Sequence, residues 1–419
     1  MAAAGKDPSA GSATPRLLDG VRVLELGQFI AAPLLTRMMA DVGAEVIKLE
    51  MAPGGDTMRG FPPFFGGQAA GFVQQNRGKR SVCIDLGNPR GIEIAYELVR
   101  HADVLVENFS PGVLERRGLG YAKLAEINPR LIMCSISGYG QTGPYANWPG
   151  TDPVAQAMSG LMHITGDPDG APVYIGTAIT DENASVHGLA AIAMALFYRE
   201  RTGRGQCIDL SLVECMFHLQ DIIANYVFSR GAVVPNRFGQ HHSGLAPRGV
   251  FQARGRYVVI AVQPRQWERF VEATKIAVLS SDARFQTAAA RVEHRFALAE
   301  IIEGWLRSFP NADVPLSILR DNAIMCAPVL DIGEAMHDPH MQSRGAMQEI
   351  DQPGFGPVPL PKSPFHFSQA VVEIPGPSPR LGEHNAEVLH RVAGYSRQAV
   401  EELTREGVLV ETPANKTPA

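Results

Sequence analysis

Residues 173 to 208, VYIGTAITDENASVHGLAAIAMALFYRERTGRGQCI, contain an apolar run that ends at Thr180 and then apolar residues at helical spacing up to Thr202 and Gly203. The pattern predicts a helix that begins at Thr180 or Asp181. The unpaired N–H groups and positive dipole of a helix N-terminus stabilise an anion, so we expect the Asp181 carboxylate to stay ionised near neutral pH. These residue types fit either a simple helix cap or a reactive carboxylate.

Strand and helix patterns alternate in the part of the chain before this stretch. The predicted strands are residues 21–26, 45–49, 81–86, 104–107 and 131–137, with another at 206–213; the predicted helices are 33–41, 89–100 and 213–230. This alternation is typical of an α/β domain with a parallel sheet and helices on both faces. The turn LGQFIAAP after the first strand lacks the GxGxxG fingerprint of dinucleotide-binding domains, which argues against NAD.

The loop GAVVPNRFGQHHSGLAPRG (231–249) separates two regions of different residue pattern, which predicts a domain boundary. A hairpin that turns at Arg254 and Gly255 then opens a smaller α+β domain. The proline-rich residues 352 to 379 look too irregular for a compact core and are expected to lie extended across a surface, before a last helix near Glu383. The predicted parts are a disordered extension (1–16), a large α/β domain (17–235), a small domain (245–340) and a C-terminal return to the large domain (345–419).

Composition excludes several classes of protein. The net charge is -5 without a run of Lys or Arg, so no nucleic-acid partner is expected, and no apolar stretch approaches membrane-spanning length. Five cysteines lie scattered without CxxC spacing, which favours reduced thiols and a cytoplasmic location. The His241-His242 pair and the His337 and His340 pair have no further ligand at suitable spacing, so no metal site is predicted.

Eight motifs together resemble the class III CoA-transferases, the superfamily of formyl-CoA transferase, carnitine CoA-transferase and α-methylacyl-CoA racemase. They cover nearly the whole chain and are specific as a set. In chain order they are LDGVRVLELGQFIAAP (18–33), GAEVIKLE with GGDTMR (43–59), NRGKRSVCIDL (76–86), ADVLVENFSPGVLERRG (102–118), the glycine-rich loop from Gly138 to Asp152, TDENAS (180–185), TGRGQ (202–206) and LGEH (381–384).

The resemblance implies a Rossmann-like large domain plus a small α+β domain, in open-ring subunits that interlock as a homodimer. Residues 352 to 379 would close the ring. It also implies that Asp181 is the covalent nucleophile, which forms an acyl-aspartyl anhydride and then an aspartyl-CoA thioester. No cofactor is bound permanently, and coenzyme A enters as part of the substrate.

The resemblance also implies which residues bind substrate. The CoA contacts expected from it are Ile30, Ala31, Ile84, Asn108, Phe109 and Arg116. The expected substrate or oxyanion residues are Gln28, Gly140, Asp152, Gly239 and Gly244. Met51 and Pro149 replace an arginine and a lysine of formyl-CoA transferase, so contacts to the nucleotide must differ. The polyglycine flap of some members has no clear counterpart, and residues 239–244 are its only candidate substitute.

Two other functions remain as alternatives. The racemases pair the aspartate with a histidine where this chain has Thr151, and a threonine cannot deprotonate a carbon acid near neutral pH, so transfer is favoured. A non-catalytic subunit of a heteromer would be expected to lack Asp181. For the substrate, Arg37, Arg59, Arg77 and Arg248 could pair with a second carboxylate, as in succinyl-CoA, or could make surface pairs of little energetic weight.

Overall fold

The structure is a computed structural model that describes residues 16 to 412. Its internal contacts divide the chain into two compact units. The first contains the chain up to Ser159, then Gly176–Leu219 and the residues from His340 onward; the second contains Gly160–Ile175 and Gln220–Pro339. Except for Arg16, the predicted N-terminal extension lies outside the described residues.

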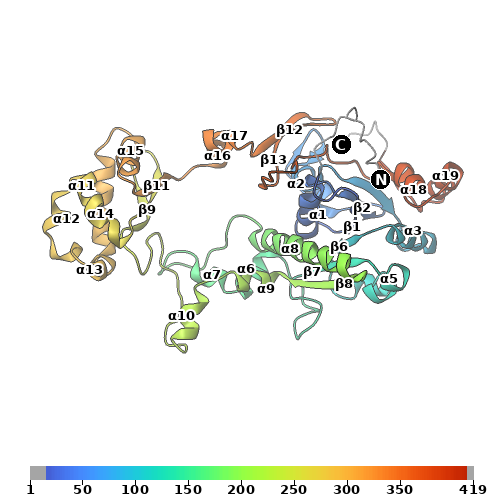
Figure 1. The fold of residues 1–419 in the computed structure, drawn as a ribbon, viewed down its shortest axis with the longest axis horizontal. Coiled ribbons are helices and arrows are strands. Elements are labelled where there is room, and N and C mark those ends of the chain that lie inside the picture. The colour runs from blue at the N-terminus through green and yellow to red at the C-terminus, as the bar shows by residue number, and fades with distance from the viewer. Residues whose placement is uncertain (1–15, 413–419) are drawn as a thin grey trace, which may run out of the picture. The chain divides into compact units, whose positions relative to one another are not determined.

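Six parallel strands form the central sheet of the first unit (Figure 1). They are β1 (Arg22–Leu26), β2 (Glu45–Met51), β5 (Arg80–Ile84), β6 (Val104–Glu107), β7 (Ile132–Ser137) and β8 (Gln206–Ser211). Their spatial order is β5-β2-β1-β6-β7-β8, which is the doubly wound order with a topological switch point between β1 and β6. The prediction of an α/β fold with a parallel sheet is confirmed.

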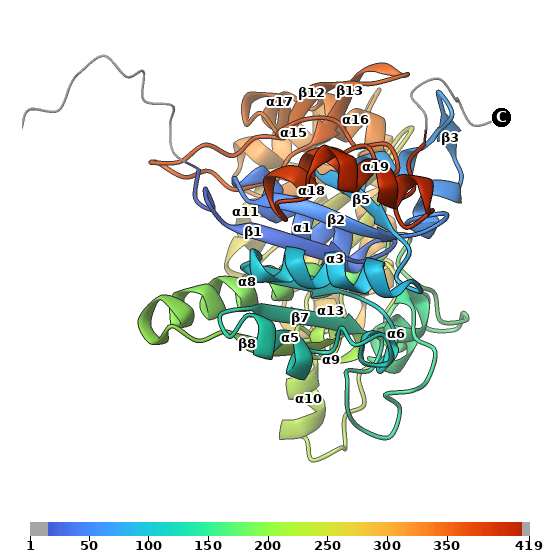
Figure 2. The ribbon, with the colours of Figure 1, turned by 90° about the vertical axis from the view of Figure 1, so that its right-hand side faces the viewer.

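Helices cover both faces of this sheet. One face packs against α3 (Pro89–Arg100), α5 (Tyr121–Ile127), α18 (Asn385–Arg391) and α19 (Arg397–Arg405); α3, α18 and α19 lie in front of the sheet in Figure 2. The other face packs against α1 (Ala31–Asp41), α8 (Ile179–Thr202) and α9 (Leu212–His218). A Cβ atom at Gly188 of α8 would lie 2.3 Å from Leu35 of α1, so the glycine allows the two helices to approach closely.

Local signals place several ends of these elements correctly. Asn88 caps α3 through its side chain, which accepts a hydrogen bond from the N–H of Arg90 (3.0 Å), and Pro89 occupies the first turn as predicted. The predicted continuous helix from 213 to 230 is wrong. The chain forms α9 and then α10 (Ile223–Phe228), because it leaves the first unit at Leu219 and its two apolar halves have different surroundings.

The other elements of the first unit are short. They are η1 (Thr57–Gly60), β3 (Phe64–Phe65), β4 (Gln68–Ala69), α2 (Ala70–Asn76), α4 (Val113–Arg116), α6 (Asp152–Met158), α17 (Pro339–Ser343, whose first residue belongs to the second unit), β12 (Met347–Gln352) and β13 (Gly356–Pro361). No helix in the described part of the chain is long and apolar enough to cross a membrane.

The second unit is built on an antiparallel sheet in the order β11-β10-β9. Its strands are β9 (Arg248–Gln252), β10 (Tyr257–Ala261) and β11 (Met325–Pro328), and β9 and β10 form the predicted hairpin at Arg254 and Gly255. Its helices are α7 (Leu161–Ile164), α10, η2 (Pro264–Gln266), α11 (Trp267–Thr274), α12 (Ala277–Ser281), η3 (Ala283–Phe285), α13 (Ala288–Glu293), α14 (Arg295–Arg307), α15 (Asp313–Asp321) and α16 (Ile332–His337). Phe251, Phe270 and Phe285 lie fully buried in its core.

The C-terminal segment returns to the first unit and is more regular than its proline content predicts. Residues 347 to 361 form the antiparallel hairpin of β12 and β13, so the expectation of an irregular stretch from 352 is wrong at its start. Pro357, Pro359 and Pro361 recur at every second position of β13, where a two-stranded ribbon loses no ladder hydrogen bond. Ser363 fixes the exit of the hairpin to α1 through bonds from its N–H and hydroxyl to Asp41.

A cluster of charged side chains lies inside the first unit. Glu25 of β1 is fully buried, with Lys48 Nζ 2.5 Å from one carboxylate oxygen and Lys79 Nζ 2.6 Å from the other. Thr36 donates a third hydrogen bond to this carboxylate, and Lys48 also pairs with Asp56 at 2.9 Å. Although burial opposes ionisation, the two ammonium groups lower the pKa of Glu25 to about 2.

We predict that Glu25→Gln destabilises the protein by about 3–5 kcal/mol at pH 7, because it removes the counter-ion of the buried Lys48 ammonium and of Lys79, whose pKa burial lowers to about 7. Chemical denaturation measures this loss. Since the pKa of Glu25 lies below its unfolded value of 4.5, its contribution is present above pH 4.5 and is lost as the pH falls toward 2, where the two proteins should converge in stability. Glu97→Gln, which removes a surface pair with Arg100, is the control and should cost less than about 0.5 kcal/mol. Equal stability of the two variants would contradict the prediction.

Candidate active site

Helix α8 begins at Ile179, one residue before Thr180 and two before Asp181, the two predicted starts. Ala178 is the N-cap residue and makes no side-chain cap, so Thr180 and Asp181 lie within the first turn. Thr180 does not cap the helix because its N–H and its hydroxyl both donate to Asp152 Oδ1, each at 2.8 Å. The predicted end is confirmed: Thr202 is the last helical residue and Gly203 adopts the left-handed conformation with φ 73°.

Asp181 is partly buried, and its carboxylate has no hydrogen-bond partner among the described residues. Burial, together with the nearby carboxylates of Asp152 and Glu182, raises the pKa of Asp181 to about 7. The expectation that it stays ionised near neutral pH is therefore wrong. The helix N-terminus favours the anion, but desolvation and two like charges outweigh that effect, so the group is poised between its two protonation states.

Asp152 anchors the start of α8 to the start of α6. Its side chain is 8% exposed and accepts hydrogen bonds from Thr180 and from Gln156 Nε2 (2.8 Å). A carboxylate that only accepts hydrogen bonds does not stabilise an oxyanion. Asp152 instead positions the turn that carries Asp181 and contributes negative charge to its surroundings.

The loops after β1 and β6 are joined across the switch point. The N–H of Gln28 donates to Asn108 Oδ1 and Asn108 Nδ2 donates to the carbonyl of Gln28, both at 2.8 Å. Both ends of the Asn108 amide are therefore occupied by the backbone of the first loop. Phe109 follows with its N–H bound to Glu107 (2.8 Å), and burial raises the pKa of Glu107 to about 7.

Helix α1 starts directly after this joined pair of loops. No hydrogen bond to the N–H of Ile30 or of Ala31 is present in the described structure. The Ser185 hydroxyl of α8 lies 2.7 Å from the carbonyl oxygen of Ala31 and 2.7 Å from that of Asp181. Of the predicted residues, Gln28, Ile30, Ala31, Asn108 and Asp181 are thus brought together around the carboxyl ends of the strands.

The other residues predicted to bind CoA or an oxyanion are buried, already hydrogen-bonded, or located in other loops. Ile84 is fully buried in the core, so its side chain is not a CoA contact in this structure. Arg116 is exposed beside the turn at Gly112 and Gly140 lies in the loop after β7 with φ 86°. Gly239 and Gly244 belong to the second unit, and their N–H groups already donate to a carbonyl and to His242. Neither glycine is a free oxyanion donor in this conformation.

The arginines considered for a second carboxylate differ in what they bind. Arg59 holds Glu50 through two hydrogen bonds (2.8 and 2.6 Å), and the fully buried Arg77 pairs with Asp41 at 3.0 Å. These two are internal ion pairs, not surface pairs and not free groups. Arg37 binds the amide oxygen of Gln75 (3.0 Å) and has no carboxylate partner in the described structure; burial, then the charge of Arg77, lowers its pKa to about 10.

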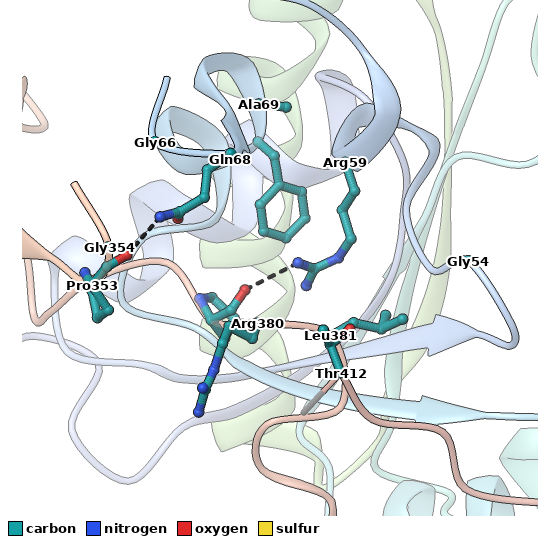
Figure 3. Close-up of a pocket in the computed structure, with 13 residues that line it drawn as sticks. Gly54, Arg59, Gly66, Gln68, Ala69, Pro353, Gly354, Arg380, Leu381 and Thr412 are labelled. Atoms are coloured by element: carbon teal, nitrogen blue, oxygen red, sulfur yellow. Dashed lines mark hydrogen bonds between the residues drawn. The ribbon is translucent and has the colours of Figure 1, made fainter. Parts of the chain in front are cut away.

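A cavity of about 390 Å³ in the first unit is separate from this constellation (Figure 3). Arg59 and Gln68 point into it, but their polar atoms are bound to the carbonyl oxygens of Pro379 (3.1 Å) and Pro353 (2.6 Å). None of the expected CoA or oxyanion residues lines it.

Sequence reasoning missed the side chains that hold the backbone of the loop after β1. Lys48 donates to the carbonyl oxygen of Gly27 (2.9 Å), and Asp56 accepts a hydrogen bond from the N–H of Phe29 (3.1 Å). Phe29 has φ 60°, which costs about 1 kcal/mol or more in a residue with a Cβ. The available signal was charged residues inside apolar strands: Glu25 in RVLEL, and Lys48 and Glu50 in EVIKLEM.

A doubly wound sheet with a poised carboxylate beside its switch point defines an α/β enzyme suited to covalent group transfer. The chain belongs to CoA-transferase family III, whose model matches residues 18–385. It is thus a class III CoA-transferase, and both the resemblance and the predicted enzyme class are confirmed.

Three similar proteins illustrate the relationship. The succinate–glutarate CoA-transferase of Agrobacterium fabrum is 37% identical over 91% of this chain and 97% of its own length. The beta subunit of the succinyl-CoA–L-malate CoA-transferase of Chloroflexus aurantiacus is 35% identical over 95% of this chain and 100% of its own. The crystal structure of a CAIB/BAIF family protein from Brucella suis is 37% identical and superposes with a TM-score of 0.82, covering 90% of this chain and 100% of that one.

We predict that Asp181→Asn stabilises the protein. Because the pKa of Asp181 is raised from 3.8 to about 7, the carboxylate destabilises the fold above pH 7, and this cost fades as the pH falls to 3.8. Partial exposure reduces the effect, so we expect a gain on the order of 1–2 kcal/mol at pH 8 and less at pH 5. Chemical denaturation at the two pH values measures it, with the exposed Asp169→Asn as the control. A gain independent of pH would be inconsistent with the raised pKa.

Proposed function

We propose that this CoA-transferase moves CoA from succinyl-CoA, or a related dicarboxylyl-CoA, to a second dicarboxylic acid, with Asp181 as the covalent carrier. The observation that carries the proposal is the unpaired, partly buried carboxylate of Asp181 in the first turn of α8. The two similar transferases are named for succinate, glutarate and L-malate, which are all dicarboxylic acids.

In the first half of the reaction the ionised Asp181 attacks the thioester carbonyl of the donor. The C–S bond breaks, CoA leaves as a thiolate, and a mixed anhydride joins the acyl group to Asp181. The thiolate then attacks the aspartyl carbonyl, the donor acid leaves as a carboxylate, and an aspartyl-CoA thioester remains. A pKa of about 7 supports this role, because a substantial fraction of a desolvated and therefore nucleophilic carboxylate is ionised at neutral pH.

The second half runs the same steps in reverse with a different acid. The acceptor carboxylate attacks the aspartyl-CoA thioester, which releases the thiolate and forms a second anhydride. The thiolate attacks the acceptor's acyl carbonyl, giving the new acyl-CoA and restoring the Asp181 carboxylate. Each step exchanges one acyl bond for another, so neither ATP nor water is consumed.

The start of α1 is suited to stabilise the negative oxygen that forms in each step. The N–H groups of Ile30 and Ala31 have no partner in the described structure, and Ser185 holds the carbonyl of Ala31 close to that of Asp181. Unpaired N–H groups at a helix N-terminus favour an anion. We therefore assign the oxyanion role to Ile30 and Ala31, and the binding of CoA to Phe109 and Arg116.

Recognition of the substrate's remote carboxylate is assigned to Arg37. Arg59 and Arg77 are excluded because each already neutralises an internal carboxylate. Arg37 has no such partner in the described structure and belongs to the same unit as Asp181, whereas Arg248 belongs to the second unit. An arginine fork binds a carboxylate through two parallel hydrogen bonds, which distinguishes a diacid from a monoacid.

We further propose a homodimer of interlocked subunits. Val186, Met194, Phe197 and Tyr198 of α8 are each about half exposed or more and share one face of the helix. An apolar face of this kind on a long helix indicates a protein interface.

All five cysteines are free, which supports a reducing, cytoplasmic location.

The test of the proposed function uses purified protein and succinyl-CoA. Wild type should form one aspartyl-CoA adduct per active site, found by mass spectrometry on the peptide containing Asp181 and discharged by hydroxylamine, with a yield that rises with pH through about 7. Asp181→Asn should form none and should lose at least about 10³-fold in transfer rate. Discharge of the adduct by a panel of acids should be fastest with dicarboxylates.

The same experiment separates the alternatives. Exchange of the α-hydrogen of a branched acyl-CoA for solvent deuterium, without an adduct, would assign the protein to racemisation. Protein that binds CoA but forms no adduct at any pH would be a non-catalytic subunit. Either result would overturn the proposed function.

The dimer is tested with a charge placed on the apolar face of α8. We expect wild type to sediment as a dimer and Phe197→Glu to shift toward monomer or to be lost in assembly, because the new carboxylate would be buried without a partner. Glu200→Lys, an exposed change one turn away, is the control and should remain dimeric. A monomeric wild type would exclude the homodimer.

A further inference from the structure

Phe29 differs from the other residues with a Cβ that adopt a positive φ. Arg230, Lys275 and Ala323 each follow the end of a helix, where the left-handed conformation is common. Phe29 instead lies between the end of β1 and the start of α1, with φ 60°. No helix end favours the conformation here, so the surrounding structure must hold it.

Asp56 is the residue that holds this turn. It is 2% exposed, and its Oδ1 accepts hydrogen bonds from the N–H of Phe29 (3.1 Å) and of Met58 (2.9 Å). Its Oδ2 lies 2.9 Å from Lys48 Nζ, which also binds the carbonyl oxygen of Gly27 (2.9 Å). One carboxylate therefore fixes both ends of the turn from Gly27 to Phe29, directly at Phe29 and through Lys48 at Gly27.

Further hydrogen bonds fix Gln28, the middle residue of the turn from Gly27 to Phe29. The Thr57 hydroxyl donates to the side chain of Gln28 (2.7 Å), while Asn108 binds the backbone of Gln28 from the β6 side. The next residues, Ile30 and Ala31, carry the unpaired N–H groups at the start of α1. The direction of those N–H groups is thus set by the turn that Asp56 holds.

We propose that Asp56 is a positioning residue for CoA transfer: by holding Phe29 in the left-handed conformation, it aims the first N–H groups of α1 at the acyl carbonyl attacked by Asp181. The inference rests on the proposed function. Asp56 is buried, and its proposed effect passes through the backbone of Phe29. A misplacement of about 1 Å in such donors is worth about 10²-fold in rate.

The test combines Asp56→Ala with two substitutions of Phe29 in the full-length enzyme. Asp56→Ala should lower kcat about 10²-fold while KM for succinyl-CoA changes less than about threefold, because donors that act on the transition state affect kcat most. Phe29→Gly in the same background should restore kcat at least about tenfold, since glycine adopts a positive φ without being held. Phe29→Ala, which removes the ring but keeps the Cβ, is the matched control and should restore nothing.

The outcomes distinguish this inference from the proposed function. Wild-type kcat in Asp56→Ala, or equal rates for the glycine and alanine double variants, would overturn the positioning role while leaving the Asp181 adduct intact. A purely stabilising Asp56 would not predict rescue by glycine. If the alanine variant does not fold, Asp56→Leu with the same Phe29 pair gives the comparison, because leucine keeps the branched shape but accepts no hydrogen bond from the N–H of Phe29. Absence of the adduct in wild type would instead refute the proposed function.

Discussion

The carboxylate of Glu25, buried between the ammonium groups of Lys48 and Lys79, is the interaction on which the active-site end of the first unit depends. Removing three charges from water costs several kcal/mol per ion, which is recovered only when geometry and hydrogen bonding are nearly complete. Here they are, because Lys48 also reaches Gly27 and Asp56, and Lys79 reaches a carbonyl of α1 and the side chain of Asn76. The cluster therefore ties β1, β2, α1 and α2 to one another below the switch point.

Asp181 is a partly buried carboxylate, and its surroundings are the opposite of those of Glu25. Glu25 receives two cations and keeps a low pKa, whereas Asp181 receives none and lies near Asp152 and Glu182, so its pKa rises. A carboxylate satisfied in the manner of Glu25 would be a poor nucleophile, because its lone pairs would already be engaged. The unit thus combines a hydrogen-bonded ion cluster, which fixes geometry, with a carboxylate in the first turn of α8 that has no cation beside it.

The local sequence pattern was sufficient to predict the strands, the hairpin at Arg254 and Gly255 and the position of Asp181 at a helix N-terminus. Each of these features depends on residues close in sequence. The ionisation of Asp181 was predicted wrongly because its pKa depends first on burial and then on the charge of Asp152, both of which only the fold creates. Gly239 and Gly244 illustrate a related limit: glycine indicates an accessible backbone, but whether its N–H is free depends on contacts made by the fold. The role of Asp56 at Phe29 likewise depends on the pairing of β1 with β2, which places Lys48 beside Glu25.

The distribution of arginines bears on the proposed recognition of a diacid. Under the proposed function, an incoming dicarboxylyl-CoA would bring negative charge toward Asp152, Asp181 and Glu182, so its remote carboxylate would require a cation that is not already neutralised. Arg59 and Arg77 stabilise the fold by pairing with Glu50 and Asp41, and both charges are therefore cancelled inside the first unit. Arg37 lies on α1, the same helix that begins with the unpaired N–H groups, and it feels the charge of Glu182 beside the nucleophile. Under the proposed function, this one helix would supply both the donors for the acyl oxygen and a guanidinium without a carboxylate partner in the described structure, which would couple the choice of acid to the geometry of the reaction.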